Sequence, residues 1–296
     1  MRNGARGGRR GHRSALPLAL LAAFGLVAAV SPSPAPDPVA SPGDRVITAP
    51  EPTPDPAPDP TPTPTPEPPA PPVDPATLPR PALEAILPSG LPTARGATGL
   101  AAVPREQLVV GYTAPSGTPA IALEAAGLGI QARWAVTDTS AGWVQVLVPF
   151  GRGALPSVDP ERTNHVAAWV RAADVEVTPA AVLTLSLAAR TLTVGDRTFP
   201  VAVGRDATPT PTGLCAVVGQ VFDPHVGDAL LTSCQSQAMD EFYAGTGYAV
   251  IALHADPEGG AAIGHARSNG CVRMRAGDFT ELLAAVPAGS VVQIVD

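Results

Sequence analysis

The sequence has 296 residues, of which 37 are proline, and its formal charge is −7. All 19 basic residues are arginine, and residues 1–30 hold five of them and no acidic residue, so the rest of the chain carries a charge of −12. A chain this acidic is a poor candidate for binding nucleic acid or an anionic lipid surface.

The first 30 residues combine an arginine-rich start, "MRNGARGGRRGHR", with the apolar run "ALPLALLAAFGLVAAV". A basic stretch before a short apolar run is typical of a secretory signal peptide. An uncleaved segment would instead be an N-terminal anchor, with residues 15–30 as a membrane tether. Either alternative predicts that the bulk of the chain is extracytoplasmic.

Residues 31–81 hold 21 of the 37 prolines. Proline has no N–H to donate to a helix or a sheet, and this segment offers little apolar surface to bury. We therefore predict a disordered, extended Pro-rich linker. Residues 82–104 connect it to the first folded region.

The region 105–175 contains short strand candidates, separated by turn residues: "QLVVGYTAP", "QARWAVTDTS", "GWVQVLVP" and "AAWVRAADVEV". Strands of this size and spacing indicate a small barrel. The steps "GWVQV" and "AWV" resemble the last strands of a bacterial SH3-like domain. That resemblance implies an SH3-like barrel with "FGRGALPSVDPERTNH" as a long surface loop.

Two questions stay open in this region. The alternation in "GWVQVLV" does not say which face of that strand is buried. Trp134, Trp143 and Trp169 either line a peptide groove or pack into the core.

Residues 179–296 predict a second, mostly β domain. The runs "AVLTLSL", "TLTV" and "TFPVAVG" form a meander of hairpins, and "VVQIV" supplies a closing strand. One short helix is expected to begin at Asp278 as its N-cap, with Glu281 three residues later. Its apolar face comprises Phe279, Leu282, Leu283 and Val286.

The segment "GHARSNGCVRM" surrounds Cys271 with a polar turn and nearby arginines, among them Arg267, Arg273 and Arg275. Positive charge favours a thiolate, so we expect a pKa below about 8.5, the value of a free cysteine. The glycine of the turn would leave backbone N–H groups free for an oxyanion. His254, at the end of the apolar run "YAVIALH", is the preferred base, and His265 is the alternative.

The pattern around these residues resembles the YkuD-type L,D-transpeptidase catalytic domain. The resemblance covers residues 179–296 and includes the earlier segment "VAVGRDATPTPTG". The matching positions are His254, Gly264, Ser268, Gly270, Cys271, Val272, Arg273, Met274, Asp278, Gly289, Val292 and Ile294. It implies a β-sandwich with one short helix after the catalytic turn.

The resemblance also implies a reaction. Cys271 would attack a peptidoglycan stem tetrapeptide, expel D-alanine and form a thioester, which the amine of a neighbouring stem would resolve into a 3→3 cross-link. His254 would be the base, and the N–H groups of Gly270 and Cys271 would hold the oxyanion. Ser268 and Arg273 would shape the turn or contact substrate. We expect no metal, no organic cofactor and a monomer at the cell wall.

This sequence departs from the family pattern at two positions. Asn269 stands where many members carry a histidine, and Ala255 stands where glycine often follows the base histidine. We interpret the first change as tuning of the site. The acceptor that reaches the thioester stays open.

Cys215 and Cys234 lie 19 residues apart in what we expect to be an oxidising compartment. They either pair with each other, leaving Cys271 free, or stay unpaired. A bridge to Cys271 would exclude the enzyme.

Other functions remain open at this point. Hydrolysis of the thioester would make the protein an L,D-carboxypeptidase, and a protein amine would lead to protein attachment to the wall. A non-catalytic cell-wall-binding protein is the alternative of another class. Sortases and NlpC/P60 peptidases fit less well, because their catalytic residues differ in spacing or order.

Overall fold

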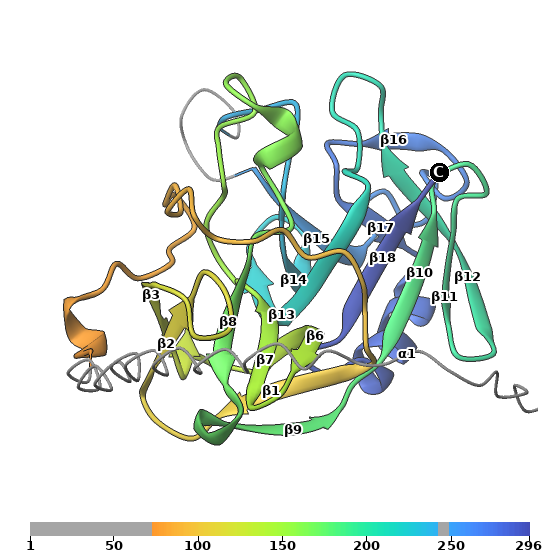
Figure 1. The fold of residues 1–296 in the computed structure, drawn as a ribbon. Helices are drawn as coiled ribbons and strands as arrows, with labels where there is room; N and C mark the ends of the chain where they lie inside the picture. Colours follow the sequence, from red (N-terminus) through yellow and green to blue (C-terminus); the bar gives the residue numbers. More distant parts are fainter. Residues whose placement is uncertain (1–72, 242–248) are drawn as a thin grey trace, which may run out of the picture. The chain divides into compact units, whose positions relative to one another are not determined.

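The computed structural model describes residues 73–241 and 249–296 (Figure 1). The expected signal or anchor, residues 1–30, and the linker up to residue 72 lie outside the described residues. Within the described ranges, no helix is long and apolar enough to cross a membrane. The described chain is mostly β, as the sequence predicts, and its strands belong to two large sheets and one two-stranded hairpin.

The first sheet has seven strands in the order β3-β2-β8-β7-β6-β1-β9. Their bounds are β1 Leu100–Pro104, β2 Leu108–Tyr112, β3 Pro119–Glu124, β6 Trp134–Ser140, β7 Trp143–Leu147, β8 Ala167–Arg171 and β9 Val175–Pro179. The hairpin β4 Ala126–Gly127 and β5 Ile130–Gln131 lies between β3 and β6 in the chain. Because β1 pairs with β9, this sheet extends beyond the expected range 105–175 at both ends. The resemblance to an SH3-like domain stays a prediction.

Short 3-10 helices connect parts of this region: η1 Pro75–Thr77, η2 Pro160–Arg162 and η3 Ala172–Asp174. Asp74 and Asp159 cap the first two, since each side chain accepts a backbone N–H from the turn that follows.

Strand β7 is buried on both faces, which explains why its alternation was ambiguous. Val144 and Val146 pack into the core of their own sheet. Leu147 belongs to a second cluster that includes Leu214 and Val291 of the C-terminal region. One face of β7 therefore packs into the core of its own sheet, and the other face packs against the C-terminal region.

The tryptophans follow the packing alternative. Trp134 is buried in the core of the first sheet, and Trp169 is also buried. Trp143 is half-buried and meets Tyr112 edge to face, with ring centroids 5.0 Å apart. Trp134 and Trp169 therefore contribute mainly to packing.

The second sheet has nine strands in the order β11-β10-β18-β13-β14-β15-β17-β12-β16, and β12 also pairs with β11 (Figure 1). The bounds are β10 Val182–Ser186, β11 Thr191–Val194, β12 Arg197–Gly204, β13 Gly213–Asp223, β14 Gly227–Gln235, β15 Val250–Ala255, β16 Ala266–Ser268, β17 Val272–Met274 and β18 Val291–Val295. The additional pairing closes the sheet on itself. β10, β11 and β12 form the predicted meander, and β18 lies between β10 and β13.

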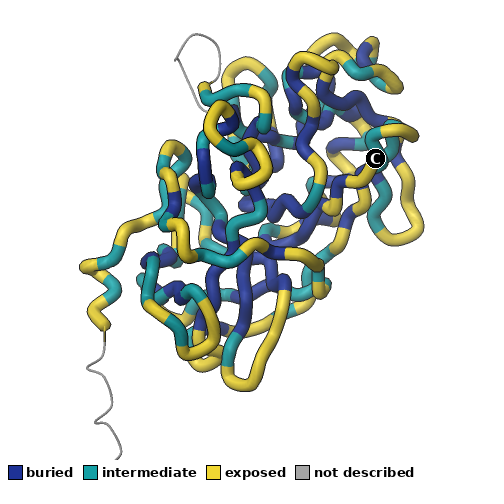
Figure 2. The backbone as a smooth tube through the Cα atoms, turned by 45° about the horizontal axis from the view of Figure 1, so that its top comes forward, coloured by how far each residue is buried: buried dark blue, intermediate teal, exposed yellow. Residues whose placement is uncertain are grey.

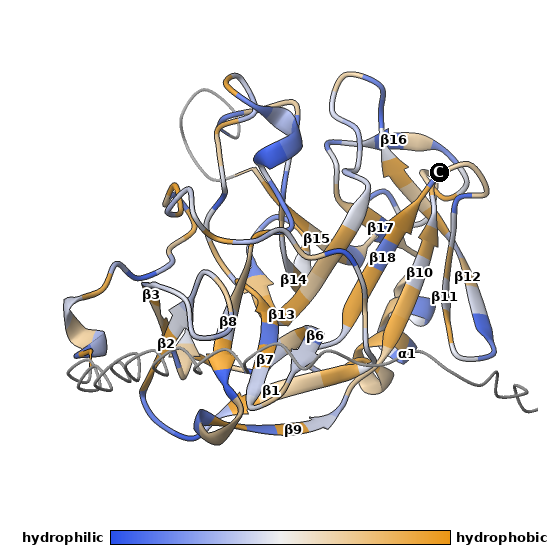
Figure 3. Ribbon diagram, in the orientation of Figure 1, coloured by the Kyte–Doolittle hydropathy of each residue, from blue (hydrophilic) through white to orange (hydrophobic). Residues whose placement is uncertain are grey.

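The closed sheet surrounds an apolar core that includes Leu183, Leu230, Leu253 and Met274. Buried residues follow these strands, while the connecting loops are largely exposed (Figure 2). The same strands are the apolar segments of the region (Figure 3). Burial of this core is the main favourable contribution to folding of the domain.

Helix α1, Ala276–Ala285, is the only α-helix in the described part of the chain, and it follows β17 as predicted. Phe279 and Leu282 are buried on the core, and Val286 is buried just beyond its end. The prediction that Asp278 caps the helix is wrong, because the N-cap position is Arg275 and no side chain bonds there. Asp278 lies in the first turn, where a carboxylate interacts favourably with the helix dipole.

The loop 150–165 is not the simple surface loop that the sequence predicts. Arg152, Thr163 and Asn164 within it are buried. The Asn164 side chain donates to the Gln235 carbonyl and accepts the Gln235 N–H, both at 2.8 Å. The loop therefore joins the N-terminal region to the end of β14.

Candidate active site

The turn that presents Cys271 is held by its own serine. The Ser268 hydroxyl donates to the carbonyl of Cys271 at 2.5 Å and accepts the N–H of Gly270 at 3.1 Å. Gly270 has a φ of +115°, and a Cβ there would come within 2.8 Å of the Ile251 side chain. Only glycine fits this conformation and this space.

Two buried threonines brace the turn from the segment before β13. Thr208 donates to the Ser268 carbonyl at 3.3 Å, and Thr210 donates to the Gly270 carbonyl at 2.7 Å. The Thr210 oxygen also accepts the N–H of Gly204. Neither threonine was predicted as a site residue, although both lie in the segment "TPTPTG", which is part of the family resemblance.

This geometry corrects the expected role of the Gly270 N–H. We predicted that it would be free to bind an oxyanion, but in the structure it donates to Ser268. The serine hydroxyl takes the N–H because its own proton goes to the carbonyl of Cys271. The N–H of Cys271 is the remaining candidate of the predicted pair.

His254 is buried at the end of β15, and its tautomer follows from one contact. Its Nδ1 lies 2.7 Å from the carbonyl of Ala255, and a carbonyl can only accept, so Nδ1 carries the proton. Burial lowers the pKa of His254 and outweighs the hydrogen bond to the Ala255 carbonyl, which raises it; the charge of Arg273 lowers it further. The ring is therefore neutral near pH 7, with Nε2 able to accept a proton.

Strand register brings His254 and Cys271 to one face of the sheet. β15 and β17 are parallel neighbours in which Leu253 pairs with Val272 and His254 pairs with Arg273. Side chains alternate between faces, so Cys271 shares the face of Arg273 and His254, opposite the buried Leu253 and Val272. The Sγ of Cys271 lies 3.8 Å from the Val250 carbonyl, which places the thiol against β15.

The arginines do not supply the free positive charge that we expected around the thiol. Arg273 pairs with Asp256 and Glu258, and Arg267 pairs with Glu258. Arg275 has the carboxylate of Asp278 at 3.8 Å. Each of these charges is therefore offset by a neighbouring carboxylate.

Cys271 is half-buried and carries a free thiol. Burial raises its pKa, which outweighs the lowering effects of the Ala252 backbone and the Arg273 charge. Our expectation of a pKa below the ordinary value is wrong for the free protein, since desolvation disfavours the thiolate. The raised pKa of Cys271 and the lowered pKa of His254 both favour the neutral forms of these side chains.

Asp256 holds Arg273 on the face that carries His254 and Cys271. Its carboxylate accepts the N–H groups of Glu258, Gly260 and Ala262. Burial raises the pKa of Asp256, but these N–H groups and the charge of Arg273 more than offset it and hold the pKa below the usual range. The guanidinium therefore has a permanent anionic partner at neutral pH.

The other predicted site residues are spread along the same segment. Gly264 is exposed with a φ of +85°, and its N–H donates to the Val201 carbonyl at 3.0 Å. His265 is also exposed. No contact joins either residue to Cys271, whereas Asn269 lies inside the turn itself, half-buried. Among the described residues, no cluster of side chains could hold a metal ion.

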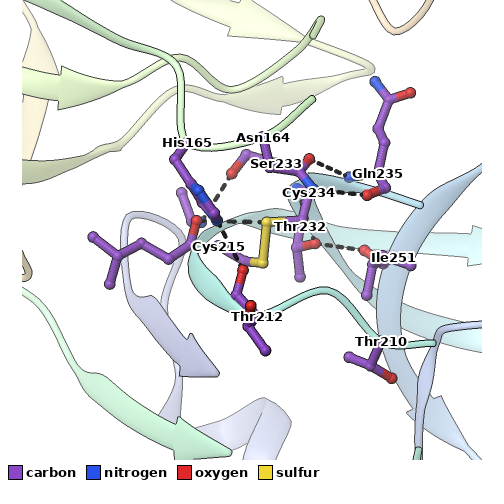
Figure 4. Close-up of a disulfide and its surroundings, with 12 residues drawn as sticks. Asn164, His165, Thr210, Thr212, Cys215, Thr232, Ser233, Cys234, Gln235 and Ile251 are labelled. Carbon is purple, nitrogen blue, oxygen red and sulfur yellow. Dashed lines mark hydrogen bonds between the residues drawn. A yellow bond between two sulfur atoms is a disulfide. The ribbon is translucent and has the colours of Figure 1, made fainter. Parts of the chain in front are cut away.

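Cys215 and Cys234 form a disulfide, and Cys271 is the free cysteine (Figure 4). The bridge joins β13 to β14, with the two Cα atoms 5.3 Å apart. Beside it, Thr232 donates to the Ile251 carbonyl and accepts the N–H of Cys234. The disulfide therefore stabilises β14, which lies between β13 and β15 in the sheet.

Residues 180–294 match the family model described as YkuD, L,D-transpeptidase catalytic domain. No curated protein matches the chain in sequence.

Among solved structures, an L,D-transpeptidase from Mycobacterium smegmatis is similar at 14% identity, over 52% of this chain and 91% of that one, with a TM-score of 0.31. L,D-transpeptidase 3 from Mycobacterium tuberculosis, in complex with a faropenem-derived adduct, gives 16% identity over 70% and 96%, with a TM-score of 0.35. The catalytic domain of the E. faecium L,D-transpeptidase gives 15% identity over 39% and 96%, with a TM-score of 0.31. At these values the structures give no residue-by-residue correspondence.

Proposed function

We propose that the protein, whose residues 180–294 match the family model of the YkuD L,D-transpeptidase catalytic domain, is a cysteine-dependent peptidoglycan L,D-transpeptidase that forms 3→3 cross-links. The proposal includes an extracytoplasmic location, because peptidoglycan stem peptides are its substrates. The observation that supports it best is the position of Cys271, directly before β17, whose neighbour β15 carries His254.

In the first half-reaction, Cys271 Sγ attacks the carbonyl between the third and fourth residues of a donor stem. The thiol proton passes to Nε2 of His254 as the S–C bond forms. The C–N bond to D-alanine then breaks, and the imidazolium returns that proton to the leaving amine. The fixed Nδ1–H contact with Ala255 keeps Nε2 as the basic atom throughout.

In the second half-reaction, the side-chain amine of an acceptor stem attacks the thioester. The new C–N bond forms, the C–S bond breaks, and a proton from the amine passes through His254 to Sγ.

The raised pKa of Cys271 bears on the first half-reaction. Since the resting thiol is neutral, His254 must remove its proton during attack, and a preformed thiolate is not required.

The test is intact-protein mass spectrometry of the full-length chain after exposure to a carbapenem, together with donor tetrapeptide assays. We expect one adduct per chain, absent in Cys271→Ala, and strongly slowed in His254→Gln. D-alanine release with dimer formation supports cross-linking.

Three other outcomes would change the assignment. Release without dimers would show an L,D-carboxypeptidase, and label transfer to a protein amine would show protein attachment. Absence of any adduct and of any release would leave a non-catalytic cell-wall-binding protein.

A further inference from the structure

The catalytic face of the second sheet continues past His254 onto β14 and β13. Paired residues of a sheet point to the same side, so the register defines rows on this face. The row of His254 contains Val221, Ala229 and Arg273. The next row contains Asp223 and Gly227. Asp223 therefore shares the face of the catalytic pair, from two strands away.

Small residues lie between Asp223 and His254 on this face. Gly227, the partner of Asp223, has no side chain, and a Cβ there would meet no heavy atom within 4 Å. Ala229, the partner of His254, contributes only a methyl group. Two strand spacings, about 10 Å, separate β13 from β15. Ala229 and His254 are buried, so the open space on this face is at Gly227, beside Asp223.

The Asp223 carboxylate is held in place by backbone. Its Oδ1 accepts the N–H groups of His225 and Val226, at 2.8 and 3.1 Å, in the turn between β13 and β14. Such a local turn fixes the side chain without an ion pair. Within the described ranges, Asp223 forms no salt bridge, in contrast to Asp256 and Glu258 of the same site.

The charge of Asp223 reaches both reacting groups. It raises the pKa of His254 and that of Cys271, so its carboxylate lies within electrostatic range of each. An unpaired carboxylate near a site attracts cations. Of the two substrates in the proposed reaction, the acceptor supplies an amine that is an ammonium ion near neutral pH.

We propose that Asp223 is a specificity-determining residue for the acceptor: its carboxylate binds the incoming ammonium group over Gly227 and directs the amine toward His254. This inference rests on the proposed transpeptidase function. The ammonium loses one proton to water, its nitrogen attacks the thioester on Cys271, the C–S bond breaks, and the second amine proton passes through His254 to Sγ. Asp223 itself forms no covalent bond.

The test variant is Asp223→Asn, which keeps an oxygen to accept the N–H groups of the turn and removes the charge. Its matched control is Asp228→Asn, because Asp228 lies on the same hairpin, is exposed, and pairs with Phe222, which places it on the opposite face. Three rates are measured on the full-length chain: acylation by a carbapenem, aminolysis by a stem peptide with a cationic side-chain amine, and aminolysis by neutral hydroxylamine.

We expect Asp223→Asn to raise KM for the cationic acceptor about twofold to fivefold, the size of one partly exposed charge pair. Carbapenem acylation and hydroxylamine aminolysis should match wild type, as should all three rates of Asp228→Asn. An unchanged KM for the cationic acceptor, or an equal loss with hydroxylamine, would overturn the role of Asp223 while leaving the transpeptidase intact. A wild-type chain that no carbapenem acylates would overturn both.

Discussion

Asn164→Ala tests whether the N-terminal region supports the strand beside the active site. Asn164 is buried and makes two 2.8 Å bonds to the backbone of Gln235, which is also buried. Alanine would leave the N–H and the carbonyl of Gln235 without these partners. A buried polar group without a partner costs about 1–3 kcal/mol, so the free energy of unfolding should fall by about 2–4 kcal/mol.

Urea unfolding and thermal unfolding of the full-length chain measure this loss. For a folded unit of about 200 residues, such a change lowers Tm by about 5–15 °C. Gln237→Ala is the control. Gln237 is half-buried and donates to the Pro160 carbonyl across the same contact, but this hydrogen bond is exposed, so its loss should cost less than about 0.5 kcal/mol. An Asn164→Ala protein as stable as the control would refute the reasoning.

Three further predictions concern the site. The rate of alkylation of Cys271 should rise with pH around a midpoint above about 8.5, because burial raises its pKa. A midpoint below that value would instead support a preformed thiolate. Gly270→Ala should destabilise the protein by about 2–4 kcal/mol, through its positive φ and the clash with Ile251, and abolish acylation; wild-type stability in urea would contradict it. Reduction of Cys215–Cys234 should cost about 2–4 kcal/mol of unfolding free energy while the carbapenem adduct on Cys271 still forms; loss of the adduct from the folded, reduced protein would contradict it.

Local patterns in the sequence predicted most strands of the second sheet. Alternating and β-branched runs such as "TLTV" and "VVQIV" became β11 and β18, because their apolar residues face the core. The helix was predicted from the spacing of Phe279 and Leu282, but its start was misplaced onto Asp278. A carboxylate in the first turn and one at the cap give similar sequence signals, since both interact with the N-terminal N–H groups.

The sequence indicated Cys271 and His254 as candidates, but it did not indicate the electrostatics around them. Arginines near Cys271 suggested a stabilised thiolate, whereas Arg273 is tied to Asp256 and Glu258. Those carboxylates lie 17 and 15 residues earlier in the chain, so only the parallel pairing of β15 with β17 shows that they meet. Asp223 was missed for the same reason, because its place on the catalytic face depends on the register of three strands.

Strand β14 carries residues of three separate features: the face of His254, the disulfide and the contact with Asn164. Its middle contributes Ala229 to the catalytic face, and its end carries Cys234 of the disulfide and Gln235, which Asn164 holds. The β14–β15 register shifts between Leu231 and Gln235, so the regular ladder does not fix this end of the strand. The disulfide and the Asn164 contact act where the ladder is irregular. The strand beside His254 is therefore held by the catalytic domain at one end of β14 and by the N-terminal region at the other.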